Sequence, residues 1–423
     1  MTSPLRVILG AAAPLALSVG AGVAVRLAAT SLLGNQATAE LAAFALAGAV
    51  LGPVTAAVAG GLRGLTPFVA PDRDRPAAAL PVLRDARWLA LLLGASGAGV
   101  VLCVPLVASA GGVPGEVTAA LGVLPPLLAA HVLLLAAGGG ANGTLVALGH
   151  ARQVLWPGLT GTAAEVLLLV ALVPRLGVAG AGVALVAGTA VAVAIANGRL
   201  ARVTGLSGRA LWPGRPRPRE ILRMAGVGLP MSAALVVKFA ALAAVAWAAA
   251  RTGTHGAAAY AILVSLDGPL GLAAFTAGQA AAPEVARAAS PAAARRVNRA
   301  ALAVAVAGVL AGAAVLGLAG EDVLGLFGSD GRVRAAATGL LPLLTVFSLA
   351  NACAIVMSAS LTGLRRPAWS LGSAVAGYGP LALVAAPVAA AWGLSGLWCA
   401  LTACAVLVLG LQTWGFVRYS ARR

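Results

Sequence analysis

The sequence predicts an all-α polytopic membrane protein of about twelve transmembrane helices in two parallel six-helix lobes. Of its 423 residues, 61% are apolar and only 10% are charged, and the mean hydropathy is +0.97. Soluble domains carry about 25% charged residues, so this chain cannot cover a water-facing surface. Apolar runs of roughly 18 or more residues, the length that spans a bilayer, recur along the chain. These observations exclude a soluble protein.

The apolar runs define the expected helices. We place them at 8–33, 39–66, 88–110, 117–148, 154–174, 177–197, 222–250, 256–282, 300–319, 332–361, 368–390 and 393–416. The first run is too long for the core of a signal peptide, so we interpret it as a retained span.

A basic, proline-rich segment divides these helices into two groups. Within 198–221, proline alternates with arginine at 212–220, a pattern that cannot be helical and is expected to be solvated. This pattern marks 198–221 as a cytoplasmic linker between the halves. We therefore expect an N-terminal six-helix lobe at 1–197 and a C-terminal six-helix lobe with a short basic tail at 222–423.

The two halves are related by an internal repeat with an offset of 216 residues. Four prolines coincide at this offset, where chance would give fewer than one, and so do several glycines. The matching pairs are Pro14 with Pro230, Pro53 with Pro269, Pro67 with Pro283, Pro126 with Pro342, Gly177 with Gly393, and Gly180 with Gly396. Because each half has six helices, both enter the membrane from the same side, as in transporters whose two lobes rock about a central site.

The distribution of arginine predicts the orientation. Arginine supplies 28 of the 29 basic residues, and 23 of the arginines fall on one face of the predicted topology against four on the other. By the positive-inside rule, both termini are cytoplasmic and the protein lies in the inner membrane. The net charge of +17 is then explained by contact with anionic lipid, and we expect no nucleic-acid partner.

Five ionisable residues fall inside the predicted spans: Glu165, Asp267, Lys238, Arg26 and His131. A charge at bilayer depth costs at least about 2.5–3.5 kcal/mol and normally faces protein or a water-filled cavity. Each lobe holds one acid and one base. The carboxylates could exchange coupling ions while the bases tune them, or the pairs could be static locks between helices; His131 could relay protons or simply pack.

Other polar and aromatic side chains in these helices are candidates for the substrate cavity. They are Asn142, Gln279, Asn351, Ser358, Trp247, Phe347 and Tyr378. Interhelical hydrogen bonding and packing are the alternative roles for all of them.

The sequence argues against an enzyme. It has no glycine-rich phosphate-binding loop with its lysine, so the chain does not hydrolyse nucleotide. Its three histidines are scattered without paired carboxylates, and its four cysteines lack metal-ligand spacing. We therefore expect no catalytic residues, no metal site and no cofactor.

Short motifs are distributed along the whole chain. The most specific are LFGSDGRV at 326–333, followed by a helix ending LTGLR at 361–365, and WGLSGLW at 392–398. Gly34 with Leu41-Ala42-Ala43, and GVAGA at 177–181, add to them. Together these motifs resemble the multidrug and toxic compound extrusion (MATE) family, within a superfamily that also contains polysaccharide and lipid-linked oligosaccharide flippases.

The resemblance implies a secondary active exporter of amphipathic organic compounds, working by cation-coupled antiport and alternating access, as a monomer, with proton or sodium as the coupling ion. A flippase for a lipid-linked oligosaccharide or glycolipid is the alternative. Two positions depart from the family pattern: Ala29-Thr30 replaces an aspartate of many relatives, and Lys238 stands where some place a glutamate.

Overall fold

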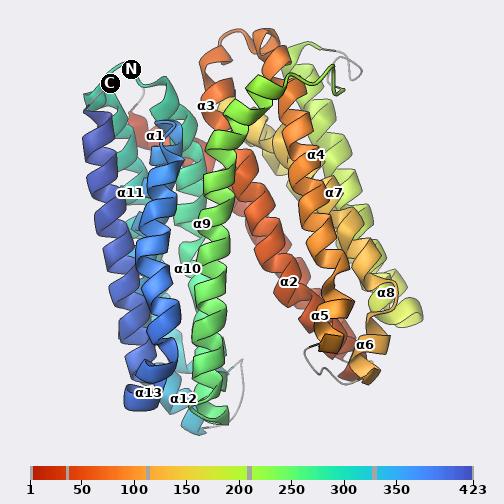
Figure 1. Ribbon diagram of the computed structural model, residues 1–423, viewed down its shortest axis with the longest axis vertical. Helices are drawn as coiled ribbons and strands as arrows, with labels where there is room; N and C mark the ends of the chain where they lie inside the picture. Colours follow the sequence, from red (N-terminus) through yellow and green to blue (C-terminus); the bar gives the residue numbers. More distant parts are fainter. Residues whose placement is uncertain (1–2, 35–37, 111–114, 207–211, 326–330, 422–423) are drawn as a thin grey trace. The chain divides into compact units, whose positions relative to one another are not determined.

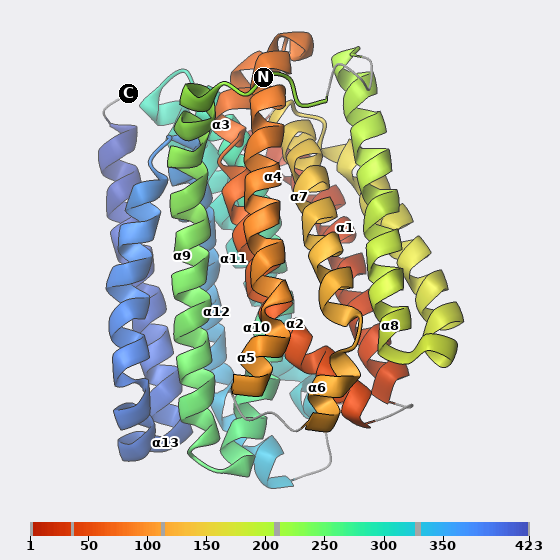
Figure 2. The same cartoon turned by 45° about the vertical axis from the view of Figure 1, so that its right-hand side comes forward.

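The computed structural model describes residues 3–34, 38–110, 115–206, 212–325 and 331–421, and within these ranges it is helical without strands (Figures 1 and 2). The chain divides into two compact units. The first unit is Ala13–Ser232, and the second unit is Ala233–Arg423 together with Met1–Ala12. The predicted all-α membrane architecture is confirmed, whereas the lobe boundaries at 197 and 222 stay predictions.

The first unit is built around a single helix, α7 (Leu124–Ala147). Its elements are most of α1 (Pro4–Gly34), α2 (Thr38–Arg63), α3 (Thr66–Val69), η1 (Ala70–Asp72), η2 (Pro76–Ala79), α4 (Leu80–Leu102), α5 (Val104–Ala110), α6 (Gly115–Leu121), α7 (Leu124–Ala147), η3 (Ala151–Val154), α8 (Leu155–Thr204) and the start of α9 (Pro218–Ala250). Helix α7 packs on both α4 and α8, and α2 packs on α4 and α7. The predicted helix at 117–148 is broken at Gly122, whose φ is +42°.

The second unit contains fewer and longer helices. It holds the remainder of α9, α10 (Thr254–Arg287), α11 (Pro291–Gly325), α12 (Gly331–Gly363) and α13 (Pro367–Ser420). Helix α10 packs on α11 and α12, and α12 packs on α13. Alanine and glycine at the contacts let these helices approach closely, as is typical of helix packing in lipid.

Two helices contribute residues to both units. The change of unit in α1 follows Ala12, and the change in α9 follows Ser232. Each lies two residues from a proline of the repeat, Pro14 or Pro230. The N-terminal end of α1 belongs to the core of the second unit, where Ile8 is only 1% exposed. The first helix of each half of the repeat, α1 or α9, is therefore divided between the two units close to its repeat proline.

Ten helices among the described residues are long and apolar enough to cross a membrane. Two of them, at Ala151–Thr204 and Pro367–Ser420, have 54 residues each, which at 1.5 Å per residue is far longer than a bilayer core of about 30 Å. Each is in fact two helices, joined at Gly177 (φ 55°, ψ −134°) or Gly393 (φ 59°, ψ −149°). Figure 1 shows the two arms of α13 side by side, and Figure 2 shows α8 turning back on itself. The two joints agree with the predicted breaks at 174–177 and 390–393.

The turn at Gly177 is completed by a carboxylate from α2. Glu40 Oε2 accepts a hydrogen bond from the amide of Val178 at 2.8 Å, which caps the positive end of the second arm of α8. A Cβ on Gly177 would lie 2.2 Å from the Glu40 carboxylate. Glycine is therefore required here by both the backbone angles and the contact.

Gly393→Ala is expected to destabilise the protein by about 1–3 kcal/mol, because side-chain-bearing residues rarely adopt these backbone angles. No atom lies within 4 Å of a Cβ at Gly393, so the loss would measure backbone strain alone. Thermal unfolding of the purified full chain in detergent would report it. Gly410→Ala, in the same helix with open space and helical geometry, should be neutral or stabilising; equal melting temperatures for both variants would contradict the expectation.

The end of the linker is fixed to the first unit. Helix α8 continues to Thr204 and helix α9 begins at Pro218, so both extend into the expected linker, whereas residues 212–217 are non-helical, as predicted. They are not simply solvated, however: Trp88 Nε1 donates to the carbonyl of Gly214 at 2.9 Å, and Arg217 forms an ion pair with Asp85. Asp85 is only 1% exposed, and a buried carboxylate requires a cation. This requirement explains why a basic loop is held against α4.

Candidate functional site

Four polar side chains from three helices form a hydrogen-bonded network in the second unit. Ser348 Oγ on α12 donates to Asp267 Oδ1 on α10 at 2.6 Å. Asn351 Nδ2, one turn further along α12, donates to Asp267 Oδ2 at 3.4 Å. Lys238 Nζ on α9 donates to Asn351 Oδ1 at 2.8 Å. We call Lys238, Asp267, Ser348 and Asn351 the polar network.

Asn351 separates the two charges of this network. Its amide oxygen faces the ammonium of Lys238 and its amide nitrogen faces the carboxylate of Asp267. The lysine and aspartate, for which a pair within the lobe was one possibility, are therefore linked through a neutral amide. Lys238 and Asp267 are half-buried, whereas Ser348 and Asn351 are 1% and 5% exposed. The neutral members anchor the network, and the charged members lie at its accessible edge.

Local sequence explains how each side chain is placed. Ser348 and Asn351 are three residues apart and share one face of α12, so both reach the same carboxylate. Asp267 precedes Pro269, which lies inside α10 and has no N–H to donate to the carbonyl four residues before it. The acid therefore stands where the helix is locally loosened. Ser348 was missed in the sequence, although its i, i+3 spacing from Asn351 is a signal that could have found it.

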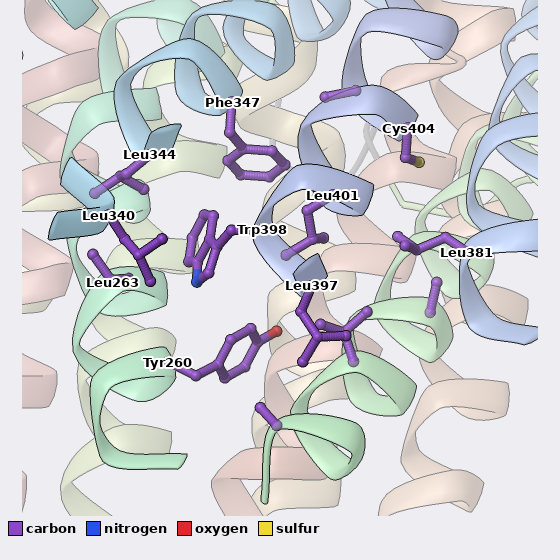
Figure 3. Close-up of a cluster of buried hydrophobic side chains, with 14 of the residues drawn as sticks. Tyr260, Leu263, Leu340, Leu344, Phe347, Leu381, Leu397, Trp398, Leu401 and Cys404 are labelled. Atoms are coloured by element: carbon purple, nitrogen blue, oxygen red, sulfur yellow. The ribbon is translucent and has the colours of Figure 1, made fainter. Parts of the chain in front are cut away.

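Aromatic side chains of α10, α12 and α13 form a cluster in the second unit. Figure 3 shows the ring of Trp398 between Phe347 and Tyr260; the ring centroids lie 5.6 Å and 6.1 Å away. Phe347 directly precedes Ser348 in α12 and is 4% exposed. Tyr378, 5% exposed, has its ring centroid 5.9 Å from Lys238 Nζ. Tyr378 thus lies beside Lys238, whereas Phe347 packs in the apolar core against Trp398.

In the first unit, His131 and Glu165 approach neighbouring residues of α8. His131 Nδ1 lies 2.8 Å from Thr189 Oγ1, and Thr189 Oγ1 donates to the carbonyl of Leu185 at 2.8 Å. The hydroxyl of Thr189 thus links the ring of His131 to the backbone of α8. A Cβ on Gly188 would lie 2.6 Å from Cβ of Glu165. His131 and Glu165 therefore lie against adjacent residues of the second arm of α8, Thr189 and Gly188 respectively.

The other predicted residues lie on several different helices. Asn142 Oδ1 is buried on α7 without a hydrogen-bond partner in the described part of the chain. Trp247 is 59% exposed, with Arg251 5.0 Å above its ring. Gln279 is half-buried on α10 and Ser358 lies on α12. The side chain of Arg26 lies outside the described residues, as does the motif segment 326–330.

The described residues contain no group of three or more histidine, cysteine, aspartate or glutamate side chains that could hold a metal ion. The polar network offers one carboxylate, one amide and one hydroxyl beside an ammonium. Two of these groups, Ser348 and Asn351, donate to the carboxylate of Asp267 and hold it in place.

Comparisons with known proteins agree with this architecture. Residues 230–388 match the family model MatE. A transporter of the MOP superfamily from Pyrococcus furiosus, described as having a binding pocket of reversed polarity that suggests a different function, is 20% identical with a TM-score of 0.86; the match covers 99% of this chain and 97% of that one. No curated protein matches the sequence.

Two further solved structures have the same fold. An outward-facing multidrug resistance MATE family transporter of the MOP superfamily is 21% identical, with a TM-score of 0.83 and coverage of 99% of this chain and 97% of that chain. The eukaryotic MATE transporter AtDTX14 is 16% identical, with a TM-score of 0.80 and the same coverage. The resemblance predicted from the sequence is therefore confirmed: the chain carries a MatE domain at residues 230–388 and has the fold of the MATE family transporters over its length.

Proposed function

We propose that this protein is a secondary exporter of amphipathic organic compounds, driven by a cation gradient and working by alternating access. The polar network carries the proposal, because it is a half-buried acid and base held by two buried neutral groups in a membrane-spanning unit. Intramembrane ionisable residues are costly and mark ion or substrate pathways. The fold and the MatE domain support export in general, and the network supplies a site for coupling.

The proposed coupling ion is the proton, and it acts at Asp267. When Asp267 is ionised, its charge and that of Lys238 balance across Asn351. When it is protonated, the network keeps a single positive charge, which opposes a cationic substrate nearby. Proton and substrate would then exclude one another, which is the requirement for antiport. An ammonium 2.8 Å from Asn351 also disfavours a sodium ion at the same oxygen.

Transport by the reconstituted full chain tests the proposal. Vesicles loaded with ethidium should lose the dye when a proton gradient is imposed, and loss should stop when a protonophore collapses the gradient. A sodium gradient imposed alone is the matched arm, and transport driven by it would overturn the choice of ion. Absence of flux with either gradient, for a panel of cationic and neutral dyes, would overturn export itself.

Glu165→Gln is expected to abolish gradient-driven efflux, since Glu165 is the half-buried acid of the first unit's α8. The glutamine keeps the shape and loses the titratable proton. Glu116→Gln is the control, because Glu116 is exposed in α6, and it should transport like the unaltered protein. Full efflux by the Glu165 variant would restrict coupling to the second unit.

A flippase for a lipid-linked oligosaccharide or glycolipid is the alternative. It is favoured by Lys238, a base where the family resemblance places a glutamate, and by the similar Pyrococcus furiosus protein that is described as having a pocket of reversed polarity. Anionic carrier phosphates would suit such a pocket. Translocation of a fluorescent lipid-linked pyrophosphate sugar, without dye efflux, would favour this reading.

A further inference from the structure

A small cavity lies in the first unit. Its volume is about 240 Å³, and its walls come from α4, α7, the end of α8 and residues 212–213 of the linker. Most lining side chains are apolar, such as Leu83, Ala90, Ala141 and Leu200. Pockets for drug-sized molecules have roughly 300–1,000 Å³, so this one suits part of a lipid chain better than a whole transported compound.

One cation lines this apolar cavity. Arg87 on α4 is half-buried, and its Nη2 donates to Oδ1 of Asn197 on α8. Asn197 is neutral, and its own Nδ2 donates to the carbonyl of Val193 at 2.9 Å, which fixes the amide orientation. A guanidinium has five N–H donors in a planar fork that matches phosphate and carboxylate oxygens. Among the described side chains no carboxylate pairs with Arg87, so an anion would complete its environment.

The linker forms the outer wall of the cavity. Trp212 and Pro213 line it. The residues that follow them in the chain make two contacts with α4. These are the 2.9 Å hydrogen bond from Trp88 to Gly214 and the ion pair of Arg217 with Asp85, which raises the pKa of Arg217 above its ordinary value. Trp212 is therefore held over the cavity by two contacts rather than by its own packing.

The surroundings of the cavity match the border of a bilayer. Leu91 and Trp212 line the cavity and are 43% and 74% exposed. Exposed tryptophan is typical of the membrane–water interface. The cavity also lies at the arginine-rich end of α4, which the charge distribution predicts to be cytoplasmic, where anionic lipids are enriched.

We propose that this cavity binds an anionic phospholipid of the cytoplasmic leaflet, with the phosphate on Arg87 and part of an acyl chain along the apolar wall beneath Trp212. Basic pockets between transmembrane helices on this side of a membrane are suited to such headgroups. Because the wall includes the segment that joins the two halves of the chain, the lipid would also fix the position of that segment against α4.

Lipid retention by the purified full chain tests this site. Native mass spectrometry would compare phosphatidylglycerol with phosphatidylcholine of identical acyl chains. The unaltered protein should retain phosphatidylglycerol preferentially, and Arg87→Gln should bind it about tenfold more weakly, since one charge-assisted contact is lost. The glutamine can still donate to Asn197, and Arg87→Lys, which keeps the charge, should retain most of the preference. Arg296→Gln, at an exposed position of α11 in the second unit, is the control and should bind like the unaltered protein.

Each outcome bears on the proposal. Equal retention of the two lipids, or an unchanged preference in the Arg87→Gln protein, would overturn it. Laurate that competes as effectively as phosphatidylglycerol would show that the site takes a free amphiphilic anion and not a phospholipid. If Arg87→Gln does not fold, Trp212→Ala decides the question, because it should weaken retention of phosphatidylglycerol without removing the charge. The result is independent of dye efflux, so it stands or fails separately from the proposed transport function.

Discussion

Asp267→Asn is expected to reduce gradient-driven efflux to the rate of vesicles without protein. Asparagine can still accept from Ser348 or Asn351, whose side chains donate to the carboxylate at 2.6 Å and 3.4 Å, but it cannot exchange a proton. The network would then keep one charge state in every conformation, and the gradient could not act on it. Dye efflux from reconstituted vesicles is the measurement.

Loss of coupling must be distinguished from loss of folding. Removing one partner of a buried charge pair can cost about 3–5 kcal/mol, so Asp267→Asn would also leave Lys238 without a counter-charge. The double variant with Lys238→Gln restores the charge balance and should recover thermal stability without recovering efflux. Ser265→Ala, at an exposed position two residues away on α10, should transport normally. Full efflux by the Asp267→Asn protein would remove Asp267 from the coupling mechanism.

Gly228→Ala is expected to destabilise the protein by about 3 kcal/mol or more, because the methyl group has no space. In the first unit, the start of α9 crosses the end of α2 at backbone contact. A Cβ on Gly228 would lie 2.4 Å from the carbonyl oxygen of Gly61, and a Cβ on Gly64 would lie 2.6 Å from the backbone of Gly228. Ser232, one turn later, donates to the carbonyl of Ala57 at 2.7 Å. The atoms that would have to move are backbone atoms of two packed helices.

Gly226→Ala provides the matched control for this prediction. Gly226 lies two residues earlier in the same helix, and nothing lies within 4 Å of its Cβ position. Alanine there should be neutral or slightly stabilising, because it is the better helix former by about 1 kcal/mol. Thermal unfolding and the yield of monodisperse protein in detergent would compare the two. A Gly228→Ala protein as stable as the Gly226→Ala protein would contradict the close crossing.

The sequence predicted the helical scaffold because local features determine it. Apolar length defined the membrane-crossing segments. The 216-residue repeat paired Gly177 with Gly393, which the structure shows to be the joints of α8 and α13. Glycine at positive φ and proline within helices act over a few residues, so a single sequence carries enough information to place them.

The polar network could not be predicted to the same extent. Lys238 and Asn351 are 113 residues apart, and Asn351 and Asp267 are 84 apart. Whether such residues meet depends on how each helix is rotated about its axis and on its depth against its neighbours. Helices that are apolar all round give no periodicity from which to obtain that rotation. The sequence therefore identified Lys238 and Asp267 as partners by charge, and it missed that Asn351 links them.

The sharing of α1 and α9 between the units has a consequence for any protein cut at the linker. A fragment that ends there would carry Ile8 without the alanine-rich core in which it is 1% exposed, and the complementary fragment would carry Met224 without its neighbours in the first unit. Neither fragment would be a self-sufficient folding module. A half-length protein built on this plan would need a second copy with which to exchange its leading helix, an arrangement equivalent to domain swapping. In the full-length chain, covalent connection makes that exchange intramolecular.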